Sequence, residues 1–217
     1  AGEQLRTHAE AAEQAMTGAL SEVRGADEGL TGTIRLGAPD GCATFLLPHV
    51  IRAIVEANPG LSVQIVALPR VFNLSKREAD MAIAVSRPRA GRLRLQKISD
   101  YSLHLAASAA YLDRHGPITS RDDLKRHNLV GYIPDMIFDR ELDYLSELGL
   151  ETVHMASNLV SVQLGLLRAG AGIGVVLDFA LKDAPELQAI LPESVELTRT
   201  FWLIRHADDD WTWWLDL

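Results

Sequence analysis

The sequence contains little cysteine and no long apolar segment. Cys42 is the single cysteine among 217 residues, which excludes an internal disulfide and fits a reducing compartment. No stretch approaches the ~18 uncharged apolar residues of a membrane-spanning helix. Residues 1–30 are polar and rich in alanine, and they lack the apolar core of an export signal. These absences favour a cytoplasmic protein that makes no contact with a membrane.

Basic charge is also scarce. The chain has 21 Lys and Arg residues against 29 Asp and Glu residues, which gives a net charge of −8, and it has no basic block. A protein that holds DNA by its phosphates needs a basic face, because binding depends on the release of counterions. Any work on DNA must therefore fall to another segment of the polypeptide. The sequence opens at Ala1 without an initiator methionine, so we expect such a segment upstream.

Patterns that carry catalysis or bind metals are missing too. The seven histidines are scattered, without the HxH or HExxH spacing of a metal site. Cys42 is expected at the start of a helix, where the pKa of a thiol falls, but no recognisable motif pairs it with a histidine. The glycines of residues 170–174 follow a predicted helix, whereas a dinucleotide fingerprint precedes one, so they are interpreted as a tight turn. We expect no catalytic residue, no metal and no cofactor.

A long helix is predicted over residues 3–28. Its apolar positions are separated by four and three residues in turn, and they are Leu5, Ala9, Ala12, Met16, Ala19 and Val23. This spacing is that of a heptad seam, so residues 1–29 are interpreted as a linker helix that supports dimerisation. An amphipathic helix that lies on its own domain is the alternative. Gly25, Gly29 and Gly32 are expected to end the helix.

Strands and helices then alternate in two successive sets. The first set is predicted to contain strands at 33–38, 61–68, 81–85 and 93–98 and a helix at 45–57. The second is predicted to contain strands at 103–107, 129–133, 152–156 and 173–177 and helices at 108–114, 140–148 and 159–169. A capping box at Ser120 predicts a further short helix. Such alternation is typical of parallel α/β sheets.

A long strand at residues 195–204 closes the pattern. It comes too late for the second set to need it, so it is interpreted as returning to the first set. The predicted organisation is a linker helix at 1–29, one subdomain at 30–97 with 199–217, and a second subdomain at 98–198. Trp211, Trp213 and Trp214 lie close together near the end of the sequence and are interpreted as a packed tail.

Several segments, in the right order, resemble the LysR-type transcriptional regulators. Residues 30–39, Leu-Thr-Gly-Thr-Ile-Arg-Leu-Gly-Ala-Pro, resemble the entry strand of their effector domain. The further similarities are the linker junction at 1–3, the first helix at 46–48 and 58–60, the third strand and its exit at 77–83 and 87–88, and the late glycine turn at 169–174.

The resemblance implies both a fold and a function. The fold is α/β, with two Rossmann-like subdomains joined by two crossover strands, like periplasmic-binding proteins of type II, and preceded by a linker helix. The function is that of the effector-sensing domain of a DNA-binding regulator, with a small-molecule effector in the cleft between the subdomains. DNA would be bound by a winged helix-turn-helix domain absent from this chain, and the protein would form a homodimer or homotetramer.

Two strand-to-helix turns are candidates for the ligand site. Residues 40–44 and 157–161 each precede or open a predicted helix, where unpaired N–H groups and the helix dipole attract anions. A simple turn or a capping residue is the alternative in each case. The resemblance implies that the cleft is lined by Gly41, Cys42, Ala43, Thr44, Ser86, Ser108, Asn158, Leu159 and Val160. Two facing helix N-termini favour a small organic acid as the effector.

Two other functions stay open at this point. A free-standing solute-binding protein of a transporter would share the fold, but it should carry an export signal and lack a dimerisation helix. An enzyme should carry a cluster of titratable residues, and none is evident in the sequence.

Overall fold

The computed structural model describes residues 2–24, 30–67, 78–88, 92–150, 152–195 and 197–206. The chain forms two compact units. The terminal unit contains residues 6–99 and 200–217, and the central unit contains residues 1–5 and 100–199. The three tryptophans near the C-terminus, together with Gly25 and Gly29, lie outside the described residues.

The terminal unit is built on a β-α-β arrangement. Its elements up to residue 84 are α1 (Gly2–Arg24), β1 (Thr31–Ala38), α2 (Asp40–Phe45), α3 (Leu47–Ala57), β2 (Gly60–Ala67) and β3 (Met81–Ala84), with the first residues of α1 assigned to the central unit. Strand β1 runs parallel to β2 along its whole length and parallel to β3 on its other side. The carboxyl ends of β1 and β3 therefore lie at the same edge of the sheet.

Local side chains explain where these elements begin and end. Pro48 lies in the first turn of α3, where its missing N–H costs nothing. At the other end of α3, Asn58 Nδ2 donates to Ile54 O at 2.8 Å, and Asn58 Oδ1 accepts from Leu30 N at 3.2 Å. One side chain thus closes α3 and ties it to the entry of β1. A Cβ at Gly60 would lie 2.7 Å from Thr31 Cγ2, so a larger residue at the start of β2 would require the Thr31 side chain to shift.

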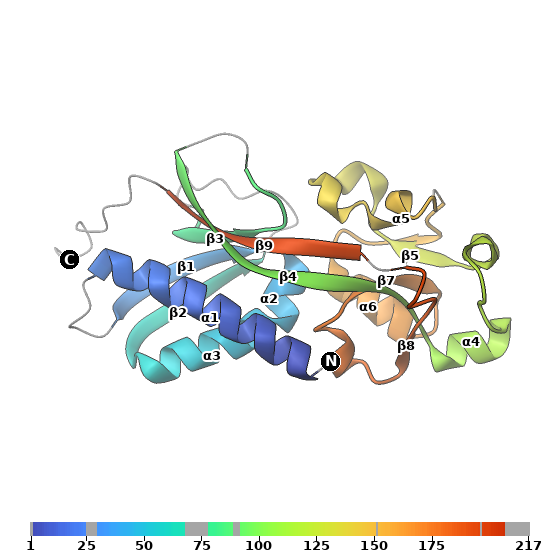
Figure 1. Ribbon diagram of the computed structural model, residues 1–217, viewed down its shortest axis with the longest axis horizontal. Helices are drawn as coiled ribbons and strands as arrows, with labels where there is room; N and C mark the ends of the chain where they lie inside the picture. Colours follow the sequence, from blue (N-terminus) through green and yellow to red (C-terminus); the bar gives the residue numbers. More distant parts are fainter. Residues whose placement is uncertain are drawn as a thin grey trace. The chain divides into compact units, whose positions relative to one another are not determined.

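Two long strands complete this sheet. They are β4 (Leu93–Ser108) and β9 (Leu197–His206), and the strand order in the terminal unit is β2-β1-β3-β9-β4. Strand β9 pairs antiparallel with β3, with Met81 opposite Arg205 (Figure 1). The predicted return of the last strand to the first set is confirmed by this pairing. Along the chain, β4 leads from the terminal to the central unit and β9 leads back.

The prediction of two separate strands at 93–98 and 103–107 is wrong, because β4 is continuous. The polar residues between them suggest that the strand is interrupted there, but the backbone at this point has a hydrogen-bond partner. Ser102 N donates to Asp178 Oδ2 at 3.2 Å, and Asp178 N donates to Ser102 O at 3.0 Å. A residue 76 positions away in the chain therefore supports the strand where its own pattern is weak.

The central unit combines short strands with short helices. Its elements after β4 are α4 (Ala109–His115), η2 (Arg121–Arg126), β5 (Leu129–Gly131), η3 (Pro134–Met136), η4 (Arg140–Leu142), α5 (Tyr144–Glu147), β6 (Met155–Ala156), α6 (Val160–Arg168), β7 (Ile173–Leu177), η5 (Leu181–Asp183) and β8 (Leu187–Ala189). The strand order is β4-β7-β5-β6, with β8 also beside β4. Strand β5 is parallel to β6 and β7, whereas β4 is antiparallel to β7 and β8, so the sheet is mixed.

Several predicted elements are shorter than the pattern suggested. The helix predicted at 140–148 is a 3₁₀ turn, η4, followed by one α-helical turn, α5. Asp139 Oδ1 accepts from Glu141 N at 3.0 Å and starts η4, and Gly149, at φ +73°, follows the end of α5. The strand predicted at 129–133 stops at Gly131, because Pro134 opens η3. The predicted capping box of Ser120 with Asp123 is present, but it opens a 3₁₀ helix.

The glycine-rich stretch after α6 is a tight turn, as predicted. Gly170 has φ +74°, a conformation that favours glycine. A Cβ at Gly172 would lie 2.4 Å from Asn128 O, and one at Gly174 would lie 2.8 Å from Val130 O. These glycines therefore let β7 approach β5 closely.

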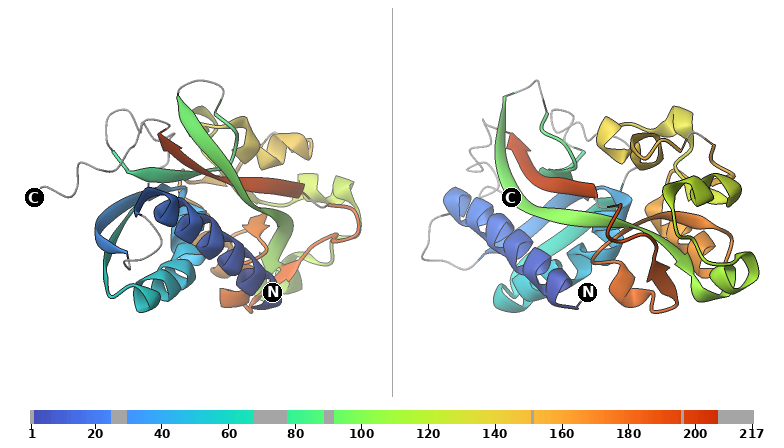
Figure 2. Two further views of the ribbon diagram at one scale, coloured as in Figure 1. Left: turned by 60° about the vertical axis from the view of Figure 1, so that its left-hand side comes forward. Right: turned by 45° about the vertical axis from the view of Figure 1, so that its right-hand side comes forward.

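The N-terminal helix is present, and its apolar face is covered by the chain itself. Ala12, Met16 and Ala19 of the predicted heptad seam are 0%, 1% and 1% exposed. In the views of Figures 1 and 2, α1 lies beside the strands of the terminal unit. The observed packing is that of an amphipathic helix on its own chain, which is the alternative to a dimer seam.

Candidate functional site

The first candidate wall is α2, at the carboxyl edge of the terminal sheet. Pro39 is the N-cap residue and makes no side-chain hydrogen bond to the helix, and the helical bonding begins with Ala43 N donating to Pro39 O at 2.9 Å. Thr44 is exposed, and its Oγ1 donates to Asp40 Oδ1 at 3.4 Å. Gly41 is buried and Ala43 is half-buried. This turn could therefore present backbone groups and the Thr44 hydroxyl to a ligand, next to the carboxylate of Asp40.

Cys42 is placed at the start of α2, as expected, but its thiol is 1% exposed. Burial raises the pKa of the Cys42 thiol, so desolvation outweighs the helix N-terminus that was expected to lower it. The side chain is a protonated core residue at neutral pH. Any role for Cys42 at a ligand belongs to its backbone.

Ser86 lies on the same edge of the terminal sheet as α2. It is half-buried and follows β3 by two residues, and β3 runs parallel to β1, with Gly37 opposite Ala82. Since α2 starts directly after β1, both Ser86 and α2 follow strands that end at this edge of the sheet. The structure thus brings together the terminal-unit candidates at one sheet edge.

The second candidate wall is the start of α6 in the central unit. The N-cap residue is Leu159, which has no side-chain cap, so the expectation that Ser157 or Asn158 caps the helix is wrong by one residue. Ser157 instead closes the turn before it, since its Oγ accepts from Leu159 N at 3.1 Å and its N donates to Gly131 O at 3.0 Å. Asn158, Leu159 and Val160 are half-buried. No acidic residue lies in the first turn of α6.

Ser108 is not brought together with the start of α6. Its Oγ accepts from Tyr111 N at 3.2 Å and caps α4. A Cβ at Gly170 would lie 3.3 Å from Ser108 Oγ, and Gly170 follows the C-terminal end of α6. A helix of nine residues is about 13 Å long, so Ser108 lies at the far end of α6 from Asn158. The hydroxyl is occupied by capping.

A buried arginine in the central unit escaped the sequence analysis. Arg199 is 7% exposed and donates through Nε to Glu141 O at 2.8 Å. It also pairs with the carboxylates of Glu141 and Glu147, and its guanidinium lies 5.6 Å from the centre of the Tyr144 ring. No local motif signals this cluster, because Arg199 is more than 50 residues away from Glu141 and Glu147 in the chain.

Two kinds of site are absent from the residues that the structure describes. Within the ranges that the structure describes, no three His, Cys, Asp or Glu side chains gather as a metal site would require. None of the described helices has the length and apolarity needed to cross a bilayer.

Similarity to known proteins identifies the family of this chain. A family model for the LysR substrate binding domain matches residues 27–210. The chain belongs to the LysR substrate-binding domain family. The resemblance to LysR-type regulators is thereby confirmed.

Relatives of this LysR domain are transcriptional regulators. The probable HTH-type transcriptional regulator SinR of Salmonella typhimurium is 27% identical over 186 residues, which are 80% of this chain and 59% of SinR. The HTH-type regulator CrgA of Neisseria meningitidis is 23% identical over 187 residues, which are 85% of this chain and 62% of CrgA. The LysR domain therefore spans less than two thirds of these relatives.

Solved structures confirm the predicted fold class. The regulatory domain of CrgA, a LysR-type regulator from Neisseria meningitidis, is 20% identical and matches with a TM-score of 0.73, over 82% of this chain and 91% of that domain. Full-length AphB of Vibrio cholerae is 22% identical with a TM-score of 0.67, over 93% of this chain and 69% of AphB. The fold is the two-subdomain α/β fold of LysR regulatory domains, which resembles periplasmic-binding proteins of type II.

Proposed function

We propose that the chain is the effector-sensing part of a LysR-type DNA-binding transcriptional regulator. The observation that carries this proposal is the family match over residues 27–210, together with relatives that are HTH-type regulators. DNA would be held by a winged helix-turn-helix segment outside this chain, since the chain itself has a net charge of −8. Such a regulator works where the DNA is, in the cytoplasm, as a homodimer or homotetramer.

We further propose that the effector is a small organic acid whose carboxylate binds at the start of α6. Helical bonding there begins with Gln163 N donating to Leu159 O at 3.1 Å, and the positive end of the helix dipole at this first turn favours an anion. The half-buried Leu159 and Val160 would contact the apolar body of the ligand, and Asn158 would add an amide.

The two helix starts are not equivalent in this proposal. Asp40 occupies the first turn of α2 and disfavours an anion there, whereas α6 has no acidic residue in its first turn. We therefore assign the carboxylate to α6. The neutral groups of Gly41, Cys42, Ala43, Thr44 and Ser86 would contact the uncharged part of the effector.

Calorimetric screening of small carboxylic acids, each beside its primary amide, tests this assignment. We expect an acid that binds the chain to lose at least tenfold in affinity when it is replaced by its amide. The Asn158→Ala variant should weaken the acid about two- to tenfold, the effect of one hydrogen bond, and the exposed Gln14→Ala variant should not. An amide that binds as tightly as its acid would contradict the assignment.

No observation favours the alternative of a free-standing solute-binding protein. The relatives named above are transcriptional regulators, and this also speaks against an enzyme.

A further inference from the structure

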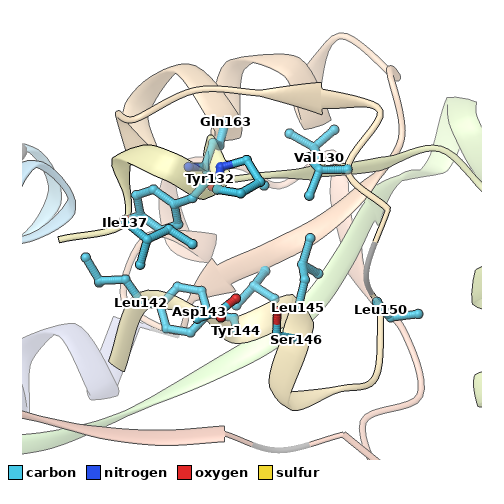
Figure 3. Close-up of a pocket in the computed structure, with 14 residues that line it drawn as sticks. Val130, Tyr132, Ile137, Leu142, Asp143, Tyr144, Leu145, Ser146, Leu150 and Gln163 are labelled. Atoms are coloured by element: carbon cyan, nitrogen blue, oxygen red, sulfur yellow. The ribbon is translucent and has the colours of Figure 1, made fainter. Parts of the chain in front are cut away.

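The central unit contains a pocket that none of the nine candidate residues lines. It encloses about 170 Å³ between the strands β5 and β7 and the segment of short helices from η3 to α5 (Figure 3). All of its described lining residues belong to the central unit. We refer to it as the central pocket.

Apolar side chains form part of the wall on both sides of the central pocket. Val130 and Val175 come from the two strands, and Ile137, Leu142 and Leu145 come from the facing segment. Val130, Leu142 and Leu145 are buried, so the cavity is bounded by core side chains. An apolar cavity of about 150 Å³ in another protein stays dry and accepts benzene, so the volume here fits one aromatic ring.

Gln163 supplies a hydrogen-bond acceptor in this apolar surrounding. Its side chain lines the pocket and is 5% exposed. Its Nε2 donates to Ser157 O at 2.8 Å. Because the backbone carbonyl of Ser157 can only accept, the amide nitrogen of Gln163 must face it, and this fixes the orientation of the side-chain amide. Among the described residues no donor reaches Gln163 Oε1. This oxygen can therefore accept a hydrogen bond from a ligand in the pocket.

The charges around the pocket exclude an anionic occupant. Among the described residues that line the cavity, Asp143 carries a charge, and none is Lys, Arg or His. Arg199 contacts the ring of Tyr144, but its guanidinium is already paired with Glu141 and Glu147. Tyr144 also lines the pocket, and burial raises the pKa of its hydroxyl, so it stays neutral. A buried anion beside Asp143 would have no partner.

We propose that the central pocket binds a neutral, single-ring aromatic molecule that donates one hydrogen bond to Gln163 Oε1, as a phenol does. This ligand class differs from the organic acid proposed for the start of α6, and the site shares no residue with that one. The two proposals therefore stand or fall separately.

Isothermal titration of the 217-residue chain with phenol, benzene and benzoate tests the proposal. We expect saturable binding of phenol and at least tenfold weaker binding of benzoate. Val175→Phe fills the cavity and should lower the affinity for phenol at least tenfold. Val162→Phe, the same change at an exposed position of α6, should leave phenol binding intact. Undetectable phenol binding, or equal binding in the two variants, would overturn the proposal.

Gln163→Leu tests the hydrogen bond with an internal control. It should weaken phenol about two- to tenfold, the effect of one neutral hydrogen bond, and leave benzene unchanged. Because both probes are titrated into one protein sample, the ratio of their affinities does not depend on how stable the variant is. An unchanged ratio would show that Gln163 does not accept from the ligand. Thermal unfolding of each variant establishes that it is folded, and if Val175→Phe is not, the Gln163→Leu ratio decides.

Discussion

At the scale of single residues, Tyr111 links a histidine to the core of the central unit. Its ring is buried and stacks on His115 with centroids 4.1 Å apart. Its hydroxyl accepts from Asn128 N at 3.1 Å and lies 3.1 Å from His127 Nδ1. The hydroxyl proton can point at Nδ1, and in that arrangement Nδ1 accepts and the imidazole is neutral.

This geometry leads to a pH-dependence. The pKa of His127 lies below its usual 6.5, because of desolvation first and then the nearby charge of His115 and Arg126, with Asp123 opposing them. As the pH falls below 6.5, His127 is protonated in the unfolded chain before it is protonated in the folded chain. The free energy of unfolding therefore decreases as the pH falls from 6.5 toward the lower pKa of the folded state, and above pH 6.5 it is unaffected by His127. Tyr111→Phe removes the donor and should raise the pKa of His127.

Nuclear magnetic resonance titration of the His127 ring protons measures this pKa directly. Tyr132→Phe is the matched control, since it removes a hydroxyl from a tyrosine that lines the central pocket, whereas Tyr111 is the tyrosine that bonds to His127. His127 titrating above 6.5, or titrating identically in wild type and in Tyr111→Phe, would refute the argument.

How much of the candidate site was predictable depends on how local each residue's role is. The turns at Asp40 and Ser157 were located because a strand followed by a helix is a local pattern. The position of Ser108 was not predicted correctly, because it depends on the packing of α4 beside the turn that follows α6. The central pocket was missed because its facing wall consists of 3₁₀ turns and a single helical turn, which have no hydrophobic periodicity.

At the scale of secondary-structure elements, α1 shows how one pattern serves two structures. Heptad spacing and the spacing of a helix that lies on a sheet both produce one apolar stripe, so the sequence alone does not separate them. The burial of Ala12, Met16 and Ala19 within the chain favours the second.

Met16→Ala distinguishes the two arrangements. If Met16 packs inside the chain, the variant should lose about 2–5 kcal/mol of unfolding free energy, as buried methionine-to-alanine changes do. This loss should not depend on protein concentration, whereas a contact between two chains would make stability rise with concentration. Denaturant unfolding at two concentrations, with the exposed Gln14→Ala as control, measures it. A loss that appears only at high concentration, where wild-type chains would be paired, would restore the dimer seam.

The elements that were predicted correctly and those that were not differ in what holds them. The unit β1-α3-β2 was predicted because alternation, Pro48 and Asn58 act within 30 residues of each other. Strand β4 was predicted as two strands because its middle is supported by Asp178, far away in the chain. Tertiary partners decide such segments, and their own residues carry no signal for them.

At the scale of the whole molecule, charge limits what the chain can bind. Several cations are already paired with neighbouring carboxylates, as in the ion pairs Arg52–Glu56, Lys125–Asp122 and Arg168–Glu186. With a net charge of −8, the long-range field repels DNA.

The chain by itself should therefore bind duplex DNA more weakly than ~10⁻⁴ M, the weak end of non-specific binding by DNA-binding proteins. Fluorescence anisotropy of a labelled duplex at 50 mM and 200 mM salt measures this, and the same chain carrying an added lysine-rich peptide shows that the assay detects electrostatic binding. Tight binding by the unmodified chain that falls steeply with salt would mean that a basic surface exists in it. It would then be wrong to assign the DNA contacts of the proposed regulator to a segment outside this chain.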